Sequence, residues 1–370
     1  MSIKIKEVTD NKGLKDFVTV PLCIYKNDRF YASPLLKDMM EHLTDKNPFF
    51  KRAKAKFFIA YNDGVPAGRI VGIINYAHLE FHKDNVGFFG LFECINDKNI
   101  ANALFDAAKN FLIENNLQIM RGPMNLSTNE ECGFLFEGFD TPSMIMIPYN
   151  PPYYNELASD YGMKKIKDLY CFIVDVPEML PAKIDRIARY AEKQGITVRT
   201  VNLKNLREEL YAFMEVYNEA WHENWGFIPI TKEEIDYMAE KLKPVALSEL
   251  VIVAEKDSQP VGFFGAIPDF NEVLRKIKGR LTPLSILKAL YYKKKIQSMR
   301  LLLFGVKEAF RHKGVESIMI REAFKGAVKH GFKKCEFSWI LEDNYETINL
   351  TKVVGAKKYK TLRIYEKEIN

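Results

Sequence analysis

Apolar and polar positions divide the chain into two successive rounds of strands and helices. In the second half, short apolar or alternating runs predict strands, and apolar residues three and four positions apart predict helices. Strands that alternate with helices in this order indicate a mixed α/β sheet with helices on its faces. The expected strands lie near 196–201, 250–255, 261–267, 300–306, 334–340 and 359–366, and the expected helices near 203–221, 231–242, 314–330 and 344–354.

Three blocks of the first half recur in the second half at nearly one offset, 193 or 194 positions. Matches at one repeated spacing indicate a duplicated unit. We therefore expect two homologous modules, residues 1–175 and residues 182–370, joined near Val174–Ile184, where Pro177 and Pro181 interrupt the strand pattern. The paired blocks are Ile3–Val8 with Ile196–Val201, Phe57–Ile73 with Val251–Ile267, and Gly162–Leu169 with Gly355–Leu362.

Composition narrows the class of protein. A chain of 370 residues that is 47% hydrophobic can form about two domains with sizeable cores. The net charge of +6 suits an anionic ligand and does not call for nucleic acid, which is not an expected partner. The N-terminal segment mixes charged and apolar residues, and no apolar run approaches the length of a membrane span, so we expect a cytoplasmic protein.

Metal binding is not expected. The five cysteines have no paired spacing, which argues against a zinc site and a disulfide framework. His78 and His82 stand four positions apart with Glu80 between them, which does not reproduce the zinc-binding H-E-x-x-H pattern.

The most informative stretch is the junction between an apolar strand and an amphipathic helix in the second half. Arg311, His312, Lys313 and Gly314 occupy this junction. The start of a helix presents unpaired backbone N–H groups and the positive end of the helix dipole, which together attract phosphate. The junction therefore predicts an anion site.

The stretch Val306–Glu316 resembles motif A of the GNAT-type N-acetyltransferases, whose loop follows the pattern [Q/R]-x-x-G-x-[G/A]. The segments 250–267 and Leu341–Lys358 resemble the flanking motifs in the same order. The resemblance implies two tandem GNAT-like modules, each a mixed, mostly antiparallel sheet flanked by helices. It also implies acetyl-CoA or another acyl-CoA as cofactor, held through these residues: Val306, Arg311, His312, Lys313, Gly314, Val315, Glu316, Ser317 and Asn344.

Two positions depart from the family pattern. Glu316 stands where glycine or alanine is usual, and Thr351 stands where family members carry the tyrosine that protonates the departing thiolate. A threonine hydroxyl is a poor general acid, so Tyr345 or water takes that role if the module catalyses. Glu342 or Asp343 can serve as general base, although Asp343 or Asn344 can equally cap the following helix.

The first module departs further from the pattern. Its counterpart of motif A, Phe89–Phe105, has neither the glycine nor the arginine, and we expect Glu93 and Asp97 in its loop to repel a pyrophosphate. The first module is therefore predicted to be a degenerate copy that binds no coenzyme A. The segment Arg121–Tyr154, rich in Gly, Pro, Asn and Ser, reads as a long functional loop.

An acceptor pocket is predicted from aromatic and polar residues in the second half. Each of these residues also has a purely structural interpretation. The tryptophans can pack against a helix pair, and the polar residues can belong to solvated turns. The basic stretch Arg275–Gln297 can contact the adenosine 3′-phosphate, an RNA or a membrane surface, or can form a solvated face. The candidate acceptor residues are Trp221, Asn224, Trp225, Asp269, Asn271 and Trp339.

Three functions remain open from the sequence. The first is transfer of an acyl group, with acetyl expected, from acyl-CoA to a small-molecule or peptide amine by direct attack of the amine on the thioester. The second is a GNAT-fold binding or sensory protein without turnover, which Glu316 and Thr351 favour. The third is a Fem-like aminoacyl transferase, which the tandem form and the basic stretch favour. These motifs do not encode the acceptor, the acyl length or the oligomeric state.

Overall fold

The computed structural model describes residues 2–369, which form two compact units. The first unit contains the chain up to Tyr170, the segment Asn271–Tyr292, and the C-terminal residues from Lys360. The second contains Cys171–Phe270 and Lys293–Tyr359. The compact units thus draw on segments that are far apart in sequence, and the predicted division into modules 1–175 and 182–370 stays a prediction.

The first unit is built on a sheet in the order β1-β2-β3-β4-β5, with β13 on the far side of β5. Every pair in this row is antiparallel except β4 with β5, which is parallel. Its elements are β1 (Ile3–Glu7), α1 (Asn11–Ile24), α2 (Leu36–His42), β2 (Ala53–Asn62), β3 (Val65–Asn75), α3 (Tyr76–His82), β4 (Val86–Cys94), α4 (Lys98–Ile113), β5 (Ile119–Gly122), β6 (Phe134–Glu137), α5 (Tyr153–Asp160), α9 (Asn271–Ile277) and α10 (Pro283–Lys293, whose last residue is assigned to the second unit).

The second unit repeats this plan with the order β8-β9-β10-β11-β12 and β7 beyond β12. Again only one of the pairs among β8 to β12 is parallel, β11 with β12. Its elements are α6 (Ala182–Lys193), β8 (Ile196–Thr200), α7 (Leu206–Ala220), α8 (Lys232–Leu242), β9 (Val251–Lys256), β10 (Gln259–Pro268), β11 (Ser298–Val306), α11 (Val315–Lys329), β12 (Lys334–Leu341) and α12 (Tyr345–Val353). The predicted fold class, tandem mixed and mostly antiparallel sheets flanked by helices, is confirmed.

Two long strands are shared between the units. β7 (Lys164–Asp175) gives its first residues to the first unit and its last to the second, and β13 (Lys357–Glu368) does the reverse. Both ends of β13 lie 193 positions after the corresponding ends of β7, the offset found in the sequence repeats.

Each parallel pair separates toward its carboxyl end. The β11–β12 ladder ends at Leu301 and Phe337, although β11 continues to Val306. The β4–β5 ladder ends likewise at Phe88 and Arg121. Ligands of such sheets bind beyond the carboxyl ends of the strands, so the divergence marks the edge on which to look for sites.

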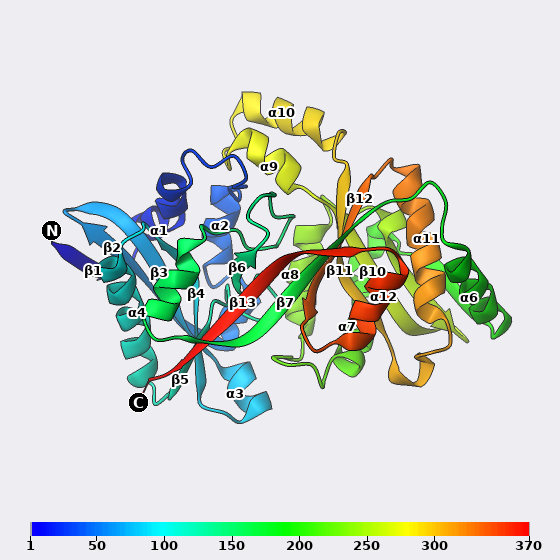
Figure 1. Cartoon of the computed structure of the whole chain (residues 1–370), viewed down its shortest axis with the longest axis horizontal. Coiled ribbons are helices and arrows are strands. Elements are labelled where there is room, and N and C mark those ends of the chain that lie inside the picture. The colour runs from blue at the N-terminus through cyan, green and yellow to red at the C-terminus, as the bar shows by residue number, and fades with distance from the viewer. Residues whose placement is uncertain (1, 370) are drawn as a thin grey trace. The chain divides into compact units, whose positions relative to one another are not determined.

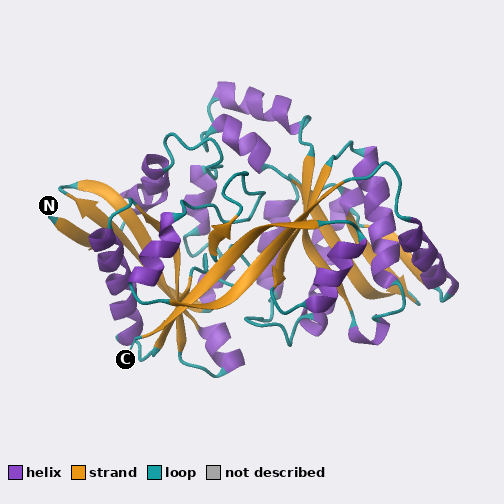
Figure 2. Ribbon diagram, in the orientation of Figure 1, coloured by secondary structure: helices purple, strands orange, loops and turns teal. Residues whose placement is uncertain are grey.

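Helices cover the sheet of each unit through their apolar faces. α4 buries its apolar stripe against the first sheet in a core rich in phenylalanine. α11 lies against β9 and β10, and α6 lies alongside α11 (Figure 1). The segment between β5 and α5 is mostly irregular, as expected for 121–154, although it contains the short strand β6 (Figure 2).

Candidate functional site

The β11–α11 junction leaves the start of a long helix open. Gly314 is the N-cap of α11 and has a left-handed backbone (φ +82°), as has His312 (φ +61°). Gly314 has no side chain to cap this helix, and in the first turn the carboxyl group of Glu316 bonds its own backbone N–H. The first N–H groups of a 15-residue helix, which follows a strand that has left its partner, are thus available to an anion.

The side chains of the junction have unequal roles. Nη2 of Arg311 donates to the carbonyl of Ala220 at 3.2 Å, so this guanidinium also holds the end of α7. His312 and Lys313 are exposed. Gly314 is required by the fold as well as by its φ, because an added Cβ would lie 2.9 Å from the carbonyl oxygen of Ile187 on α6.

Glu316 places a carboxyl group in the first turn of α11. Burial raises the pKa of this carboxyl above its ordinary value, against the opposing effects of its own backbone N–H and of His312. The charge of Glu346 also raises the pKa, which shows that the start of α12 lies near the start of α11. The start of α12 thus acts electrostatically on the first turn of α11.

Of the residues after β12 with a predicted role, some form hydrogen bonds within α12 and others are exposed. Asn344 caps α12, because its Oδ1 accepts from the backbone N–H of Thr347 at 3.1 Å. The buried hydroxyl of Thr351 donates to the carbonyl of Ile348 at 2.7 Å, so it is engaged within its own helix. Glu342 is half-buried, whereas Asp343 and Tyr345 are exposed. Their catalytic roles stay predictions.

The predicted acceptor residues do not form one cluster. Trp221 packs over Gly305, near the end of β11, where an added Cβ would lie 2.5 Å from the indole ring. Asn224 and Trp225 are half-buried in the turn after α7, and Trp339 is half-buried on β12. The backbone N–H of Asp269 bonds to the carbonyl of Ser298, at the opposite end of β11 from the junction, and Asn271 belongs to the first unit.

The sequence did not reveal a buried polar network on β11, β12 and β13. Glu336 is fully buried, and its carboxylate lies 3.5 Å from Nε of Arg300. The hydroxyls of Ser338 and Tyr359 also donate to it. Burial and the charge of Glu336 raise the pKa of Tyr359. A glutamate and an arginine in strands that are otherwise apolar were the available signal, because charged residues are rarely buried unless paired.

Glu93 lies elsewhere than predicted. It is the penultimate residue of β4 and not part of the following loop, so it takes the strand position that Gly305 holds in β11. Its Oε2 accepts hydrogen bonds from the hydroxyls of Tyr25 (2.8 Å) and Tyr154 (2.7 Å), and Oε1 lies 3.7 Å from Nη2 of Arg69. Burial raises the pKa of Glu93 above its ordinary value. A carboxylate in an apolar strand was again the overlooked signal.

Glu93 lines a cavity of about 280 Å³ in the first unit. The wall combines polar groups with apolar side chains, and Nε of the buried Arg69 has no hydrogen-bond partner within the described chain. Asn271, predicted to contact an acceptor, also lines this cavity. Polar lining residues include Arg69, Glu93, Asn125, Glu131 and Asn271, and apolar ones include Phe30, Met39, Leu91, Phe92, Phe134, Ile145, Ile147 and Leu274.

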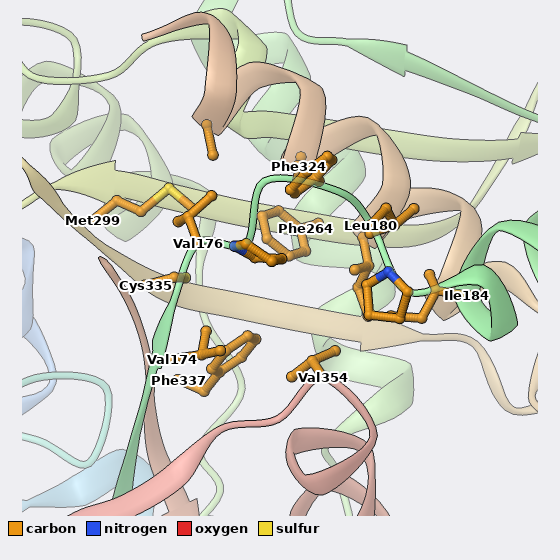
Figure 3. Close-up of a pocket in the computed structure, with 15 residues that line it drawn as sticks. Val174, Val176, Leu180, Ile184, Phe264, Met299, Phe324, Cys335, Phe337 and Val354 are labelled. Carbon is orange, nitrogen blue, oxygen red and sulfur yellow. The ribbon is translucent and has the colours of Figure 1, made fainter. Parts of the chain in front are cut away.

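A second, apolar cavity of about 70 Å³ lies in the second unit (Figure 3). Phe264, Met299 and Cys335 from three strands meet Phe324 of α11 and Leu180 of the segment before α6 around it. Met299 is near the start of β11, whereas Val306 ends that strand, so this cavity lies away from the anion site.

Possible metal ligands and membrane-spanning helices bear on the class of protein. Within residues 2–369, no group of three or more His, Cys, Asp or Glu side chains could hold a metal ion. None of the helices in the same range is long and apolar enough to cross a bilayer.

Solved structures identify the fold. The chain resembles a tandem GNAT protein from the clavulanic acid biosynthesis pathway over 100% of this chain and 99% of that one, with a TM-score of 0.61 and 12% identity. It also resembles a GCN5-related N-acetyltransferase from Sphaerobacter thermophilus over 100% and 96%, with a TM-score of 0.56 and 13% identity. The predicted resemblance to tandem GNAT proteins is thereby confirmed at the level of the fold.

Two curated proteins are similar in sequence over nearly their full length. Protein YghO of Escherichia coli K12 is 30% identical over 371 residues, which cover 99% of this chain and 95% of that protein. The bacterial ceramide synthase of Caulobacter vibrioides is 32% identical over 364 residues, which cover 96% and 95%. No family model matches the chain.

Proposed function

The chain belongs to the family that includes protein YghO and the bacterial ceramide synthase, and from this premise we propose that it transfers an acyl group from acyl-CoA to the amine of a long-chain amino alcohol. The observation that carries the proposal is the open N-terminus of α11 behind the divergent β11, within a tandem GNAT fold. In this proposal the pyrophosphate of coenzyme A accepts hydrogen bonds from the first N–H groups of α11.

The cavity of the first unit supports the acceptor class. A long-chain amino alcohol has an ammonium head and a hydrocarbon tail. The carboxylates of Glu93 and Glu131 suit the head, and the apolar wall suits the first carbons of the tail. Asn271 can orient the hydroxyl group, which keeps the predicted acceptor role for this residue.

The chemistry requires one proton acceptor and one proton donor. The amine reaches the protein as an ammonium ion, so it must lose a proton before its nitrogen attacks the thioester carbon. Glu93 is the better-placed base, because it is buried against a cavity, whereas Asp343 is exposed. The C–N bond forms, the nitrogen gives up its second proton as the C–S bond breaks, and water or a nearby hydroxyl passes that proton to the thiolate; the first proton leaves from Glu93 to solvent.

The test is release of free thiol from acyl-CoA by the purified protein. Sphinganine and glucosamine serve as long-chain and polar amines, each with acetyl-CoA and palmitoyl-CoA. We expect thiol release and a mass-confirmed amide with sphinganine, and little of either with glucosamine. Equal rates with both amines would contradict the acceptor class.

A second candidate is a binding protein without turnover. The observation that favours it is the hydroxyl of Thr351, which is tied to its own helix at the position of the usual acid. A thermal shift with coenzyme A, without thiol release from any acyl-CoA and amine pair, would support this candidate over the enzyme.

A further inference from the structure

The helix α10 exposes an unusual amount of apolar surface. Leu284 is 63% exposed, Leu287 66%, Leu290 58% and Tyr291 56%. Leu281, just before the helix, and Ile286 are also exposed. No other stretch of eleven positions in the described chain contains as many exposed large apolar side chains. Large contiguous patches of this kind in soluble proteins mark sites of interaction.

The exposed residues form one face of the helix. Leu284, Leu287 and Tyr291 are three and four positions apart, so they lie on one stripe, with Leu290 beside Leu287. The other side is the packed one: Ser285 is buried and Tyr292 half-buried. The leucine stripe therefore points away from the side on which α10 packs.

The surroundings of the stripe are strongly basic. Residues 271–297 contain eight Lys or Arg and a single acid, Glu272, whereas the net charge of the whole chain is only +6. The remaining chain is thus close to neutral, and the positive charge concentrates here. Lys288 lies within α10, and Lys294 follows it; both are exposed. An apolar stripe with flanking lysines is complementary to a layer of anionic headgroups above hydrocarbon.

We propose that α10 binds the surface of an anionic lipid bilayer, with its leucine stripe inserted into the interface and its lysines at the headgroups. The helix lies in the plane of the membrane and does not cross it, in keeping with its length of 11 residues. A leucine stripe favours lipid over nucleic acid, since nucleic-acid surfaces combine basic residues with stacking aromatics. This inference stands independently of the proposed acyl transfer.

The test is binding of the full chain to sedimented vesicles of phosphatidylcholine, with and without 30% phosphatidylglycerol. We expect binding only to the anionic vesicles. Leu284→Ser/Leu287→Ser/Leu290→Ser should lower the partition coefficient at least tenfold. Lys288→Ala/Lys294→Ala should lower it roughly 25-fold, about fivefold for each lysine near an anionic surface.

Control variants replace exposed apolar residues by serine and exposed lysines by alanine elsewhere. Val65→Ser/Val328→Ser alters exposed apolar residues, and Lys12→Ala/Lys15→Ala alters exposed lysines of α1. Both should bind as the wild type does, and circular dichroism melts show that every variant is folded. A folded leucine variant with undiminished vesicle binding would overturn the proposal. The proposal would also be overturned if the wild type bound single-stranded RNA more tightly than vesicles, and if the lysine variant lost this RNA binding while the leucine variant kept it.

Discussion

In each unit a nine-residue strand is followed by a long helix, β4 by α4 and β11 by α11. The start of the helix is capped differently in the two units. β4 and β11 are both nine residues long, and three residues connect β4 to α4 where eight connect β11 to α11. In the first unit, Asp97 caps α4, because its Oδ1 accepts from Asn99 (2.8 Å) and Ile100 (3.2 Å). In the second, the cap is Gly314. The first helix is capped by the carboxylate of Asp97, whereas the N-cap of the second has no side chain.

The two strands that precede these helices, β4 and β11, also differ in the residue next to their last position. Glu93 gives β4 a carboxylate that lines a cavity, whereas Gly305 at the same strand position of β11 is covered by Trp221. The unit whose helix is capped by its own carboxylate thus carries a buried carboxylate on the strand, and the unit with the glycine cap carries none at that position. In the proposed function, the donor therefore binds in one unit and the acceptor in the other, and we expect the two roles to be separable by mutation.

The largest effect is expected where a buried carboxylate serves stability alone. Glu336→Ala removes the partner of the buried Arg300, whose side chain is only 5% exposed. Loss of one member of a buried pair costs about 3 to 5 kcal/mol, so the free energy of unfolding in urea should fall by that amount. Asp160→Ala, which breaks an exposed pair with Lys98, is the control and should cost less than about 1 kcal/mol. A small loss in Glu336→Ala would contradict the structural role.

Glu93→Gln should affect turnover. The amide oxygen still accepts from Tyr25 and Tyr154, but the base is lost, and so is the charge opposite the buried Arg69, so urea unfolding accompanies the assay and the rate is taken per folded molecule. Turnover should fall about 100-fold or more, with unchanged affinity for acyl-CoA. Glu131→Gln, on the same cavity wall, should lower turnover less than tenfold. Equal affinity and equal turnover in Glu93→Gln and the wild type would remove Glu93 from the mechanism.

The pH profile gives Glu93 a separate signature. Burial raises the pKa of its carboxyl above the ordinary value of 4.5, so the basic form appears only as the pH rises through this raised pKa. The wild-type rate should therefore climb with pH over a range above pH 4.5. That limb should be missing in Glu93→Gln, and its persistence would point to another base.

The sequence was sufficient for the fold because periodicity and repetition are local signals. All six strands and four helices expected in the second half are present with nearly the expected bounds, and the β7 and β13 repeat has the expected offset. The sequence also places the glycine at the start of the helix, and Gly314 is the N-cap of α11 with a left-handed backbone; binding of an anion by Arg311–Ser317 stays a prediction.

The buried polar groups could not be located in the same way. Glu93 was assigned to a loop because alignment with Arg311 assumed connections of equal length, whereas five residues are missing before α4. The cavity around Glu93 takes residues from positions as distant as Phe30 and Leu274. Contacts of that separation depend on tertiary packing, which no local pattern specifies.

Gly314→Ala tests why the open cap carries glycine. The new Cβ would meet the carbonyl oxygen of Ile187, and alanine would have to adopt the left-handed φ that glycine has at this position. We therefore expect the free energy of unfolding to fall by about 2 to 3 kcal/mol. Gly355→Ala is the matched control, with φ +81° and open space around it, and should cost about 1 kcal/mol. Equal losses would show that contact with α6 adds nothing and that the left-handed backbone alone requires the glycine.

The smallest effect is expected at Glu316, where the comparison of the two helix starts is sharpest. Its carboxylate lies in the first turn of the open helix, near the proposed pyrophosphate, and Glu316→Gln removes one like charge without shortening the side chain. Because the site is partly exposed and screened, affinity for coenzyme A at neutral pH should rise only severalfold, about 1 kcal/mol.

Burial raises the pKa of Glu316, so the wild type gains the neutral form as the pH falls, and its affinity should approach that of the variant. Titration calorimetry of both proteins at several pH values and one ionic strength measures this difference in affinity. Protonation of coenzyme A itself affects both proteins equally, so it cancels from the difference. Glu346→Gln, at an exposed position on α12, is the control and should change affinity less. If Glu316→Gln binds no tighter at any pH, the start of α11 does not hold the phosphates.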